Sequence, residues 1–154
     1  MNNNIIFVKL DEDAIIPTKS DPNSAGYDLY INHDLFFSNE RTIYNCPTGI
    51  AVILPELTSE IKCYGRIAPR SGLALKGFDV GAGVIDNNYR GEIKVIIYTN
   101  PMYNLTGIVK KGSRIAQLIP TLYLDTIPKE ITKEEFMQLQ QTERGERGFG
   151  STGI

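Results

Sequence analysis

The sequence predicts an all-β fold of the jelly-roll or β-clip type, built from short antiparallel strands. Segments rich in β-branched and aromatic residues recur at intervals of about eight to twelve residues. Turn-forming residues such as Pro47, Pro55 and Asn100 separate these segments. No long amphipathic helical repeat interrupts them, and this combination is typical of a β-sandwich or jelly roll.

Several segments have the alternating or β-branched pattern of a strand. In chain order they are residues 8–10, 26–31, 41–46, 48–54, 60–68, 92–99, 105–110 and 115–124. A β-hairpin is predicted among them: residues 80–85 form its first strand, residues 86–88 its turn, and Tyr89 begins the return toward residues 93–98.

Two short helices are predicted between and after the strands. Ser71 is placed to cap a helical turn that runs to Leu75 and that Gly77 ends. The segment 132–135 (TKEE) is a capping box, so a second helix is expected over about residues 133–141.

Length and charge limit the classes of protein that the chain can belong to. A chain of 154 residues is expected to form a single core, which we place in one domain over residues 1–143, followed by a flexible arm over residues 144–154. The formal charge of −2 provides no basic surface for stable nucleic-acid binding. There is no apolar run of about 18 residues and no signal-peptide pattern, so we expect a soluble, intracellular protein that does not bind membranes.

The cysteines and the histidine do not form a metal or disulfide pattern. Cys46 and Cys63 lack the spacing of a zinc motif, and His33 is the sole histidine. We therefore expect both thiols to be buried in apolar packing.

The segment 68–77 (APRSGLALKG) carries the first candidate binding residues. Arg70 and Ser71 enter the short predicted helix, whose first N–H groups would point at an anion. This arrangement suits a phosphate. The alternative is an ordinary capped turn with a surface arginine.

The predicted hairpin places a carboxylate and an aromatic ring together at its turn. Asp86 and Tyr89 flank the turn. The hairpin lacks side chains at Gly81, Gly83 and Gly91, so a flat ligand can lie against its main chain. The alternative is that Asp86 forms an Asx-turn and Tyr89 only packs.

The last eleven residues suit neither a core helix nor a buried strand. They combine four glycines with Arg144, Phe149, Ser151 and Thr152. Arginine and hydroxyl groups bind phosphate, and an aromatic ring can stack on a base, so this arm is expected to be mobile until a ligand binds. The alternative is a frayed, glycine-rich terminus.

Five separated segments, in this order and spacing, resemble the motifs of the trimeric dUTP pyrophosphatase (dUTPase) family. They are residues 25–30 (AGYDLY), 68–76 (APRSGLALK), 83–92 (GVIDNNYRGE), 112–119 (GSRIAQLI) and 144–153 (RGERGFGSTG). The resemblance implies a jelly-roll protomer and a homotrimer whose active sites are shared between subunits. It also implies Mg²⁺-dependent hydrolysis of dUTP to dUMP and pyrophosphate, which would limit uracil incorporation into DNA and supply dUMP.

The resemblance also implies roles for individual residues. Asp86 would orient the water that attacks the α-phosphorus, Tyr89 would lie against the deoxyribose, and Asp28 would contact Mg²⁺ through a water. The other implied substrate-binding residues are Arg70, Ser71, Gly72, Gly83, Val84, Ile85, Arg114, Gln117, Arg144, Phe149, Gly150, Ser151 and Thr152. Uracil's pairing edge presents an acceptor, a donor and an acceptor, which the main chain of residues 83–89 can read.

The patterns around Asp28 and Gln117 leave more than one interpretation open. Alternation along residues 27–31 puts Asp28 on the face opposite Tyr27 and Leu29, which fits either a solvent-facing or a functional position. Gln117 interrupts an apolar segment, so its amide is expected to have a partner, either a ligand or an interface.

Some features depart from the family pattern, and other functions fit the same fold. Asn88 stands where many members have aspartate, and Arg147 stands where glycine is usual. The segment 63–68 is more similar to eukaryotic and large-DNA-virus members, which implies the cytoplasm or nucleus of a eukaryotic or virus-infected cell. The alternatives are a dCTP deaminase-like enzyme and a non-catalytic deoxynucleotide sensor.

Overall fold

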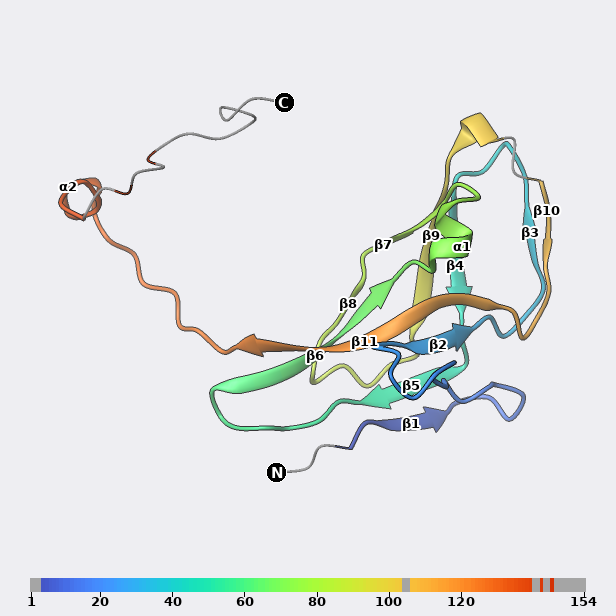
Figure 1. The fold of residues 1–154 in the computed structure, drawn as a ribbon, viewed down its shortest axis with the longest axis horizontal. Helices are drawn as coiled ribbons and strands as arrows, with labels where there is room; N and C mark the ends of the chain where they lie inside the picture. Colours follow the sequence, from blue (N-terminus) through green and yellow to red (C-terminus); the bar gives the residue numbers. More distant parts are fainter. Residues whose placement is uncertain (1–3, 104–105, 140–141, 143–144, 146–154) are drawn as a thin grey trace.

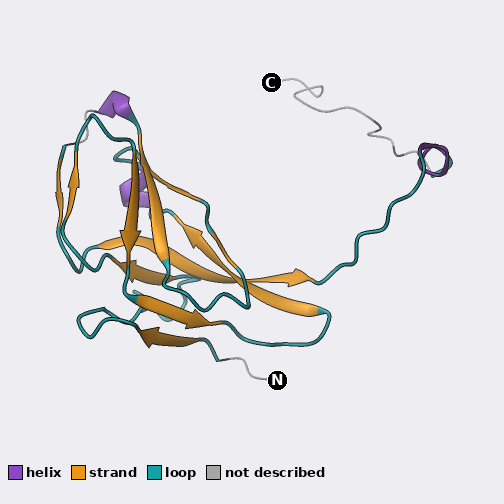
Figure 2. Ribbon diagram, turned by 180° about the vertical axis from the view of Figure 1, so that it is seen from behind, coloured by secondary structure: helices purple, strands orange, loops and turns teal. Residues whose placement is uncertain are grey.

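The chain folds into a β-rich body, as the sequence predicts. The computed structural model describes residues 4–103, 106–139, 142 and 145. Within them, strands make up the body and the helices are a few short turns (Figures 1 and 2). The all-β prediction is therefore confirmed.

The elements follow one another with short connections. The strands are β1 (Ile6–Lys9), β2 (Tyr27–Tyr30), β3 (Leu35–Phe37), β4 (Ile43–Pro47), β5 (Ile50–Ile53), β6 (Ile61–Ala68), β7 (Phe78–Gly81), β8 (Val84–Ile85), β9 (Lys94–Thr99), β10 (Gly107–Val109) and β11 (Arg114–Leu124). The helical turns are α1 (Ser71–Ala74), η1 (Pro101–Tyr103) and α2 (Lys133–Met137). The short strand β3 lies where the sequence predicts no strand.

The strands pair antiparallel in small sheets with the orders β2-β11-β6-β8, β4-β9-β7, β1-β5 and β10-β3. The long strand β11 is central because it pairs with β2 on one edge and with β6 on the other. Its residue Gln117 is opposite Asp28 of β2 and also opposite Ala68 of β6. Three chain segments that are far apart in the sequence therefore meet at one point of this sheet.

The core is formed by the inward-facing residues of these strands. It contains Leu29, Ile31, Tyr44, Cys46, Ile50, Val52, Cys63, Ile67, Ile93, Val95, Ile97, Ile115 and Leu118, among others. Tyr44 is buried, and its hydroxyl lies 2.8 Å from the carbonyl oxygen of Arg41 and accepts a bond from the amide of Ser38. The polar end of this large side chain is therefore satisfied inside the core.

The predicted hairpin is only partly correct, because residues 80–85 do not form one strand. β7 pairs with β9, whereas β8 leaves β9 and pairs with β6. The change of partner occurs at Ala82, which has a φ of 50°. At Gly83 a Cβ would lie 2.3 Å from the carbonyl oxygen of Ile67, so glycine is what lets β8 approach β6 this closely.

Both predicted helices are present, with corrections at their ends. Ser71 is the first residue of α1 rather than its cap; the cap position is Arg70, whose side chain makes no capping bond. Gly77 has a φ of 84° and follows the helix as expected. The capping box of α2 is confirmed at Thr132 and Glu135, and the helix ends at Met137, earlier than the predicted residue 141.

After β11 the chain leaves the β body and runs to α2 (Figure 1). Residues 122–139 are all exposed. The division of the chain into residues 1–143 and 144–154 stays a prediction, because residues 143–144 and 146–154 lie outside the described residues. Among the helices that the structure describes, none has the length and apolar character needed to cross a membrane.

The thiols of Cys46 and Cys63 are free and buried, as the sequence predicts. Burial raises the pKa of the Cys46 thiol to about 12, and burial also raises the pKa of Cys63. The reactive thiolate is therefore scarce at either position near neutral pH.

We expect both thiols of the native protein to resist a chromogenic thiol reagent at pH 8. Both should react rapidly once guanidinium chloride unfolds the chain, since unfolding restores solvent contact and the ordinary pKa. The absorbance of the released dye measures the count in each state. Rapid labelling of the native protein would contradict the burial of these side chains.

Candidate functional site

A buried carboxylate on β2 holds two arginine side chains in place. The Oδ1 atom of Asp28 lies 3.0 Å from Nε of Arg70, and its Oδ2 atom lies 3.3 Å from Nη1 of Arg114. Asp28 is 6% exposed, whereas both guanidinium groups reach solvent. Among the interpretations of Asp28, the solvent-facing one is therefore wrong. Its charge orients two cations toward the surface.

Gln117 lies beside this group and has the partner that its amide requires. Its Nε2 atom donates to the carbonyl oxygen of Pro69 at 3.1 Å. A Cβ at Gly26 would lie 2.8 Å from the Oε1 atom of Gln117, so the glycine leaves room for the amide. The partner is thus a main-chain group of the segment that carries Arg70, and neither the expected ligand nor the expected interface is needed to satisfy this amide.

These residues line a cavity of about 450 Å³, which is formed by Ser20, Asp28, Arg70, Ser71, Gly72, Leu73, Lys76 and Gln117. Lys76 takes part in none of the ion pairs found among the described residues. Asp28 supplies one negative charge against Arg70, Arg114 and Lys76. The net charge is therefore positive, and the cavity suits an anion such as a phosphate group.

The sequence did not point to three residues of this cavity, which are Ser20, Leu73 and Lys76. Lys76 is the last residue of the segment 68–76. Its positive charge, in a segment that already carries Arg70, was the available signal in the sequence. Ser20 comes from the loop before β2, where the sequence has no pattern that points to the cavity. A bridge between Thr18 and Asp28 attaches that loop to β2, and the pairing of β2 with β11 places Asp28 opposite Gln117.

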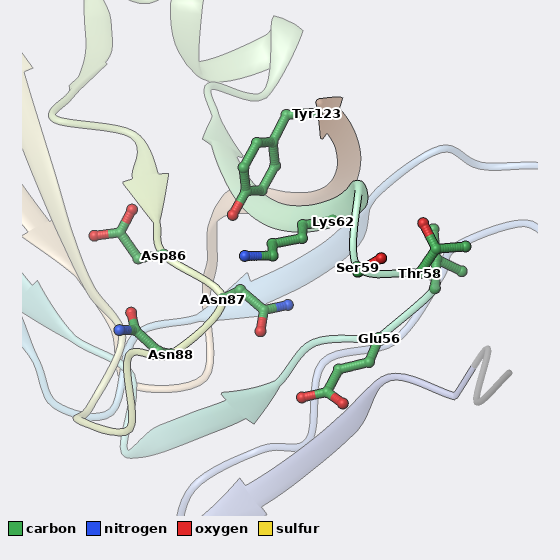
Figure 3. Close-up of a pocket in the computed structure, with 9 residues that line it drawn as sticks. Glu56, Thr58, Ser59, Lys62, Asp86, Asn87, Asn88 and Tyr123 are labelled. Carbon is green, nitrogen blue, oxygen red and sulfur yellow. The ribbon is translucent and has the colours of Figure 1, made fainter. Parts of the chain in front are cut away.

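The second candidate group lies at the turn after β8. A larger cavity of about 780 Å³ is lined by Glu56, Leu57, Thr58, Ser59, Lys62, Asp86, Asn87, Asn88 and Tyr123 (Figure 3). The turn is closed by the amide of Tyr89, which donates to the carbonyl oxygen of Asp86 at 3.0 Å. Asn87 fastens the turn to β6, because its Nδ2 atom donates to the carbonyl oxygen of Cys63 at 3.0 Å.

The carboxylate of Asp86 is exposed and available to a ligand. Among the hydrogen bonds of the described residues, none uses this carboxylate, so the Asx-turn interpretation is wrong. Tyr89 is 43% exposed, and its hydroxyl donates to the carbonyl oxygen of Glu92 at 2.9 Å. The hydroxyl end of the ring is therefore held in place while the side chain stays accessible.

The structure divides the predicted site residues between two places on one chain. Asp28, Arg70, Ser71, Gly72 and Gln117 line the smaller cavity, and Arg114 reaches it through Asp28. Asp86 lines the larger cavity, while Gly83, Val84, Ile85 and Tyr89 belong to the adjoining β8 and turn. Arg144, Phe149, Gly150, Ser151 and Thr152 lie outside the described residues.

The described residues do not form a site that coordinates a metal ion directly. They contain no cluster of three or more histidine, cysteine, aspartate or glutamate side chains. Both carboxylate oxygens of Asp28 already contact arginines. A Mg²⁺ ion at this place would take most of its oxygen ligands from a bound phosphate chain and from water.

Comparisons with known proteins identify the family. A family model described as dUTPase matches residues 12–153. The deoxyuridine 5'-triphosphate nucleotidohydrolase of Variola virus is 44% identical to the chain, with 100% of the chain and 96% of the viral protein covered. The chain therefore belongs to the dUTPase family.

Solved structures agree in fold. The Staphylococcus bacteriophage 80alpha dUTPase with dUPNHPP is 26% identical, with a TM-score of 0.76 over 99% of this chain and 100% of that one. A mutant dUTPase from S. aureus phage phi11, which is described for its coordination of a structural Mg(II) ion, is 21% identical, with a TM-score of 0.69 over 87% of this chain and 99% of that one. The expected jelly-roll fold is thus confirmed.

We expect Asp28→Asn to destabilise the fold, because it leaves two guanidinium groups facing a neutral amide. The loss should be about 1–3 kcal/mol, below the value for a fully buried pair, since both arginines reach solvent. Urea denaturation followed by circular dichroism measures the change. The matched control is Asp13→Asn, which removes an exposed ion pair with Lys111 and should leave the midpoint unchanged. Equal midpoints for both variants would contradict the structural role of Asp28.

Proposed function

We propose that this chain hydrolyses dUTP to dUMP and pyrophosphate by attack of water on the α-phosphorus. Membership of the dUTPase family along nearly the whole chain supports the proposal. The observation that carries it within the structure is the cation-rich cavity around Asp28, which has the charge and the size for a phosphate chain.

The opened hairpin supports recognition of uracil by the main chain. β8 is the edge strand of its sheet. The main-chain groups on one side of β8 therefore pair with β6, and those on its other side point away from the sheet. The carbonyl oxygen of Gly83 is committed to the amide of Ile67 at 2.8 Å. On the side that points away, the amide of Val84 donates to the carbonyl oxygen of Ala82 at 3.0 Å. The carbonyl oxygen of Val84 is left to accept the ring N–H of uracil, and cytosine, whose ring nitrogen at this place is an acceptor, would leave it unpaired.

Asp86 is the residue that we assign to the reacting water. Its exposed carboxylate can orient the water in line with the departing pyrophosphate and accept a proton late in the reaction. Stabilisation of the developing charge comes from Arg70, Arg114 and Lys76 around the phosphate oxygens. In this proposal Tyr89 lies against the deoxyribose, where a 2′-hydroxyl group would clash.

The proposed reaction needs Asp86 and Arg70 at the same substrate, but the two residues line different cavities of one chain. This separation supports a homotrimer, in which different copies can supply them. Asp86 does not line the cavity of Arg70. The proposed complete site therefore combines Asp86 from one copy with Arg70 from another, with dUTP between them. Arg144, Phe149, Gly150, Ser151 and Thr152 are proposed to cover the base and the phosphates, with Phe149 on uracil.

Mg²⁺ is the proposed cofactor. When bound, the ion neutralises charge on the triphosphate, and this makes the pyrophosphate a better leaving group. Asp28 is the residue that would contact a water of the ion, because each of its oxygens keeps a lone pair besides the one directed at an arginine.

A substrate comparison tests the proposed function. We expect kcat/KM for dUTP to exceed the values for dTTP, dCTP and UTP by about 10² or more, and chelation of Mg²⁺ should lower the dUTP rate. Pyrophosphate release measures turnover. Ammonia release from dCTP would favour the deaminase alternative, and binding of dUTP without turnover would favour the sensor.

We expect Asp86→Asn to lower kcat for dUTP by about 10² or more with a smaller change in KM, because the amide holds the position of the carboxylate but accepts no proton. The control Asp79→Asn changes an exposed aspartate that lines neither of the two cavities and should keep the parent rate. Full activity of the Asp86→Asn variant would contradict the assignment of Asp86 to the reacting water.

We also expect truncation after Thr142 to leave a folded protein with severely reduced turnover. The removed segment carries the residues proposed to cover the substrate and to exclude bulk water. Circular dichroism and size-exclusion chromatography report on folding and assembly, and pyrophosphate release reports on activity. Near-normal kinetics would show that the segment does not cover the substrate.

A further inference from the structure

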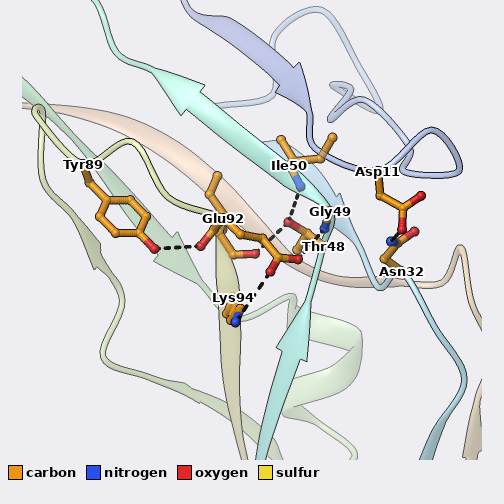
Figure 4. A network of polar contacts seen from close by, with 9 residues as sticks. Asp11, Asn32, Thr48, Gly49, Ile50, Tyr89, Glu92 and Lys94 are labelled. Atoms are coloured by element: carbon orange, nitrogen blue, oxygen red, sulfur yellow. Dashed lines mark hydrogen bonds and ion pairs between the residues drawn. The ribbon is translucent and has the colours of Figure 1, made fainter.

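The segment that follows Tyr89 is fastened to a distant turn of the chain by one side chain. The Oε1 atom of Glu92 accepts a hydrogen bond from the amide of Gly49 at 2.8 Å, and its Oε2 atom lies 3.6 Å from Nζ of Lys94 (Figure 4). The main-chain carbonyl of the same residue accepts the hydroxyl of Tyr89 at 2.9 Å. Glu92 therefore connects the turn at Gly49 to the ring of Tyr89.

The turn that receives Glu92 is itself held firmly. Thr48 is 1% exposed, and its hydroxyl donates to the carbonyl oxygen of Ile93 at 2.7 Å. The amide of Ile93 donates to the carbonyl oxygen of Ile50 at 2.8 Å. Gly49 has a φ of 68°, and a Cβ there would lie 2.8 Å from Cβ of Ala14, so the turn fits closely against its neighbours. Glu92 is therefore bonded to a part of the core that has little freedom to shift.

The position of the Tyr89 hydroxyl depends on Gly91, the residue that precedes Glu92. A Cβ at Gly91 would lie 2.4 Å from the phenolic oxygen. The φ of Gly91 lies outside the left-handed region, so glycine is needed here for space and not for its backbone conformation. The ring thus has a close steric limit on one side and a hydrogen bond at its end.

We propose that Glu92 is a positioning residue that sets the discrimination between deoxyribose and ribose. This inference rests on the proposed function, in which Tyr89 faces the sugar. The carboxylate fixes the main chain at residue 92, the carbonyl of residue 92 fixes the phenol, and the ring then presents a rigid wall where a 2′-hydroxyl group would lie. Glu92 acts through Tyr89 and is not expected to touch the substrate.

Rigidity is what such a wall requires. A mobile apolar side chain rejects an added hydroxyl group only weakly, because a shift of a fraction of an ångström relieves the clash. A side chain that cannot shift rejects the hydroxyl group more strongly. A ring that is free to swing would admit UTP while it still accepts dUTP. Loss of the anchor should therefore appear mainly as a change in the ratio of the two substrates.

The experiment compares kcat/KM for dUTP and UTP in variants of this connection. We expect Glu92→Ala to lower the dUTP/UTP ratio about tenfold. Glu92→Gln should keep the ratio, because its amide oxygen still accepts the Gly49 bond. Lys94→Ala should also keep it, because the 3.6 Å contact involves a lysine side chain that is 51% exposed.

Gly91→Ala provides an independent test that leaves Glu92 intact. The added methyl group displaces the phenol, so the ratio should fall as it does in Glu92→Ala. An unchanged ratio in Gly91→Ala would show that the position of the ring does not set the discrimination, and this result overturns the inference even if Glu92→Ala fails to fold. A lower melting temperature with an unchanged ratio in the variants would overturn the inference, since it would show a structural role alone. Failure of the parent protein to hydrolyse dUTP would instead overturn the proposed function, so the two outcomes are distinguishable.

Discussion

The pairing of β11 with both β2 and β6 is the constraint on which the anion cavity depends. Through it Gln117 lies opposite Asp28 on one side and Ala68 on the other. The arginine that follows β6 therefore reaches the carboxylate on β2, and Arg114 at the start of β11 reaches the same carboxylate. One buried negative charge then orients two cations, which is a less costly arrangement than burying any of the three charges alone.

The second part of the molecule depends on the point where the chain changes its strand partner. At Ala82 and Gly83 the chain leaves β9 and joins β6, and the separation of β8 from β9 opens the ribbon beside Asp86 and Tyr89. A regular hairpin would have used these main-chain groups in its own ladder. The opening leaves the outer edge of β8 without a partner strand. The bonds of Asn87 and Glu92 hold the chain that follows β8 in place.

The local patterns of the sequence were sufficient for most of the strands, for the capping box of α2 and for the burial of both cysteines. They failed where a residue's environment comes from distant parts of the chain. Alternation alone could not decide between a solvent-facing and a functional Asp28, because the guanidinium groups that cover it come from segments about 40 and 90 residues away in the chain. The same limit hid Ser20 and the connection between Glu92 and Gly49.

By itself, the sequence determined the all-β class and the segments that resemble the dUTPase motifs, since strand periodicity and turn chemistry are properties of neighbouring residues. The tertiary structure alone decided that β8 belongs with β6, that Asp28 is buried between two arginines, and that Arg70 and Asp86 line two separate cavities. These features depend on which strands become neighbours in the folded sheet, and strand pairing between distant segments is decided by the packing of the whole core.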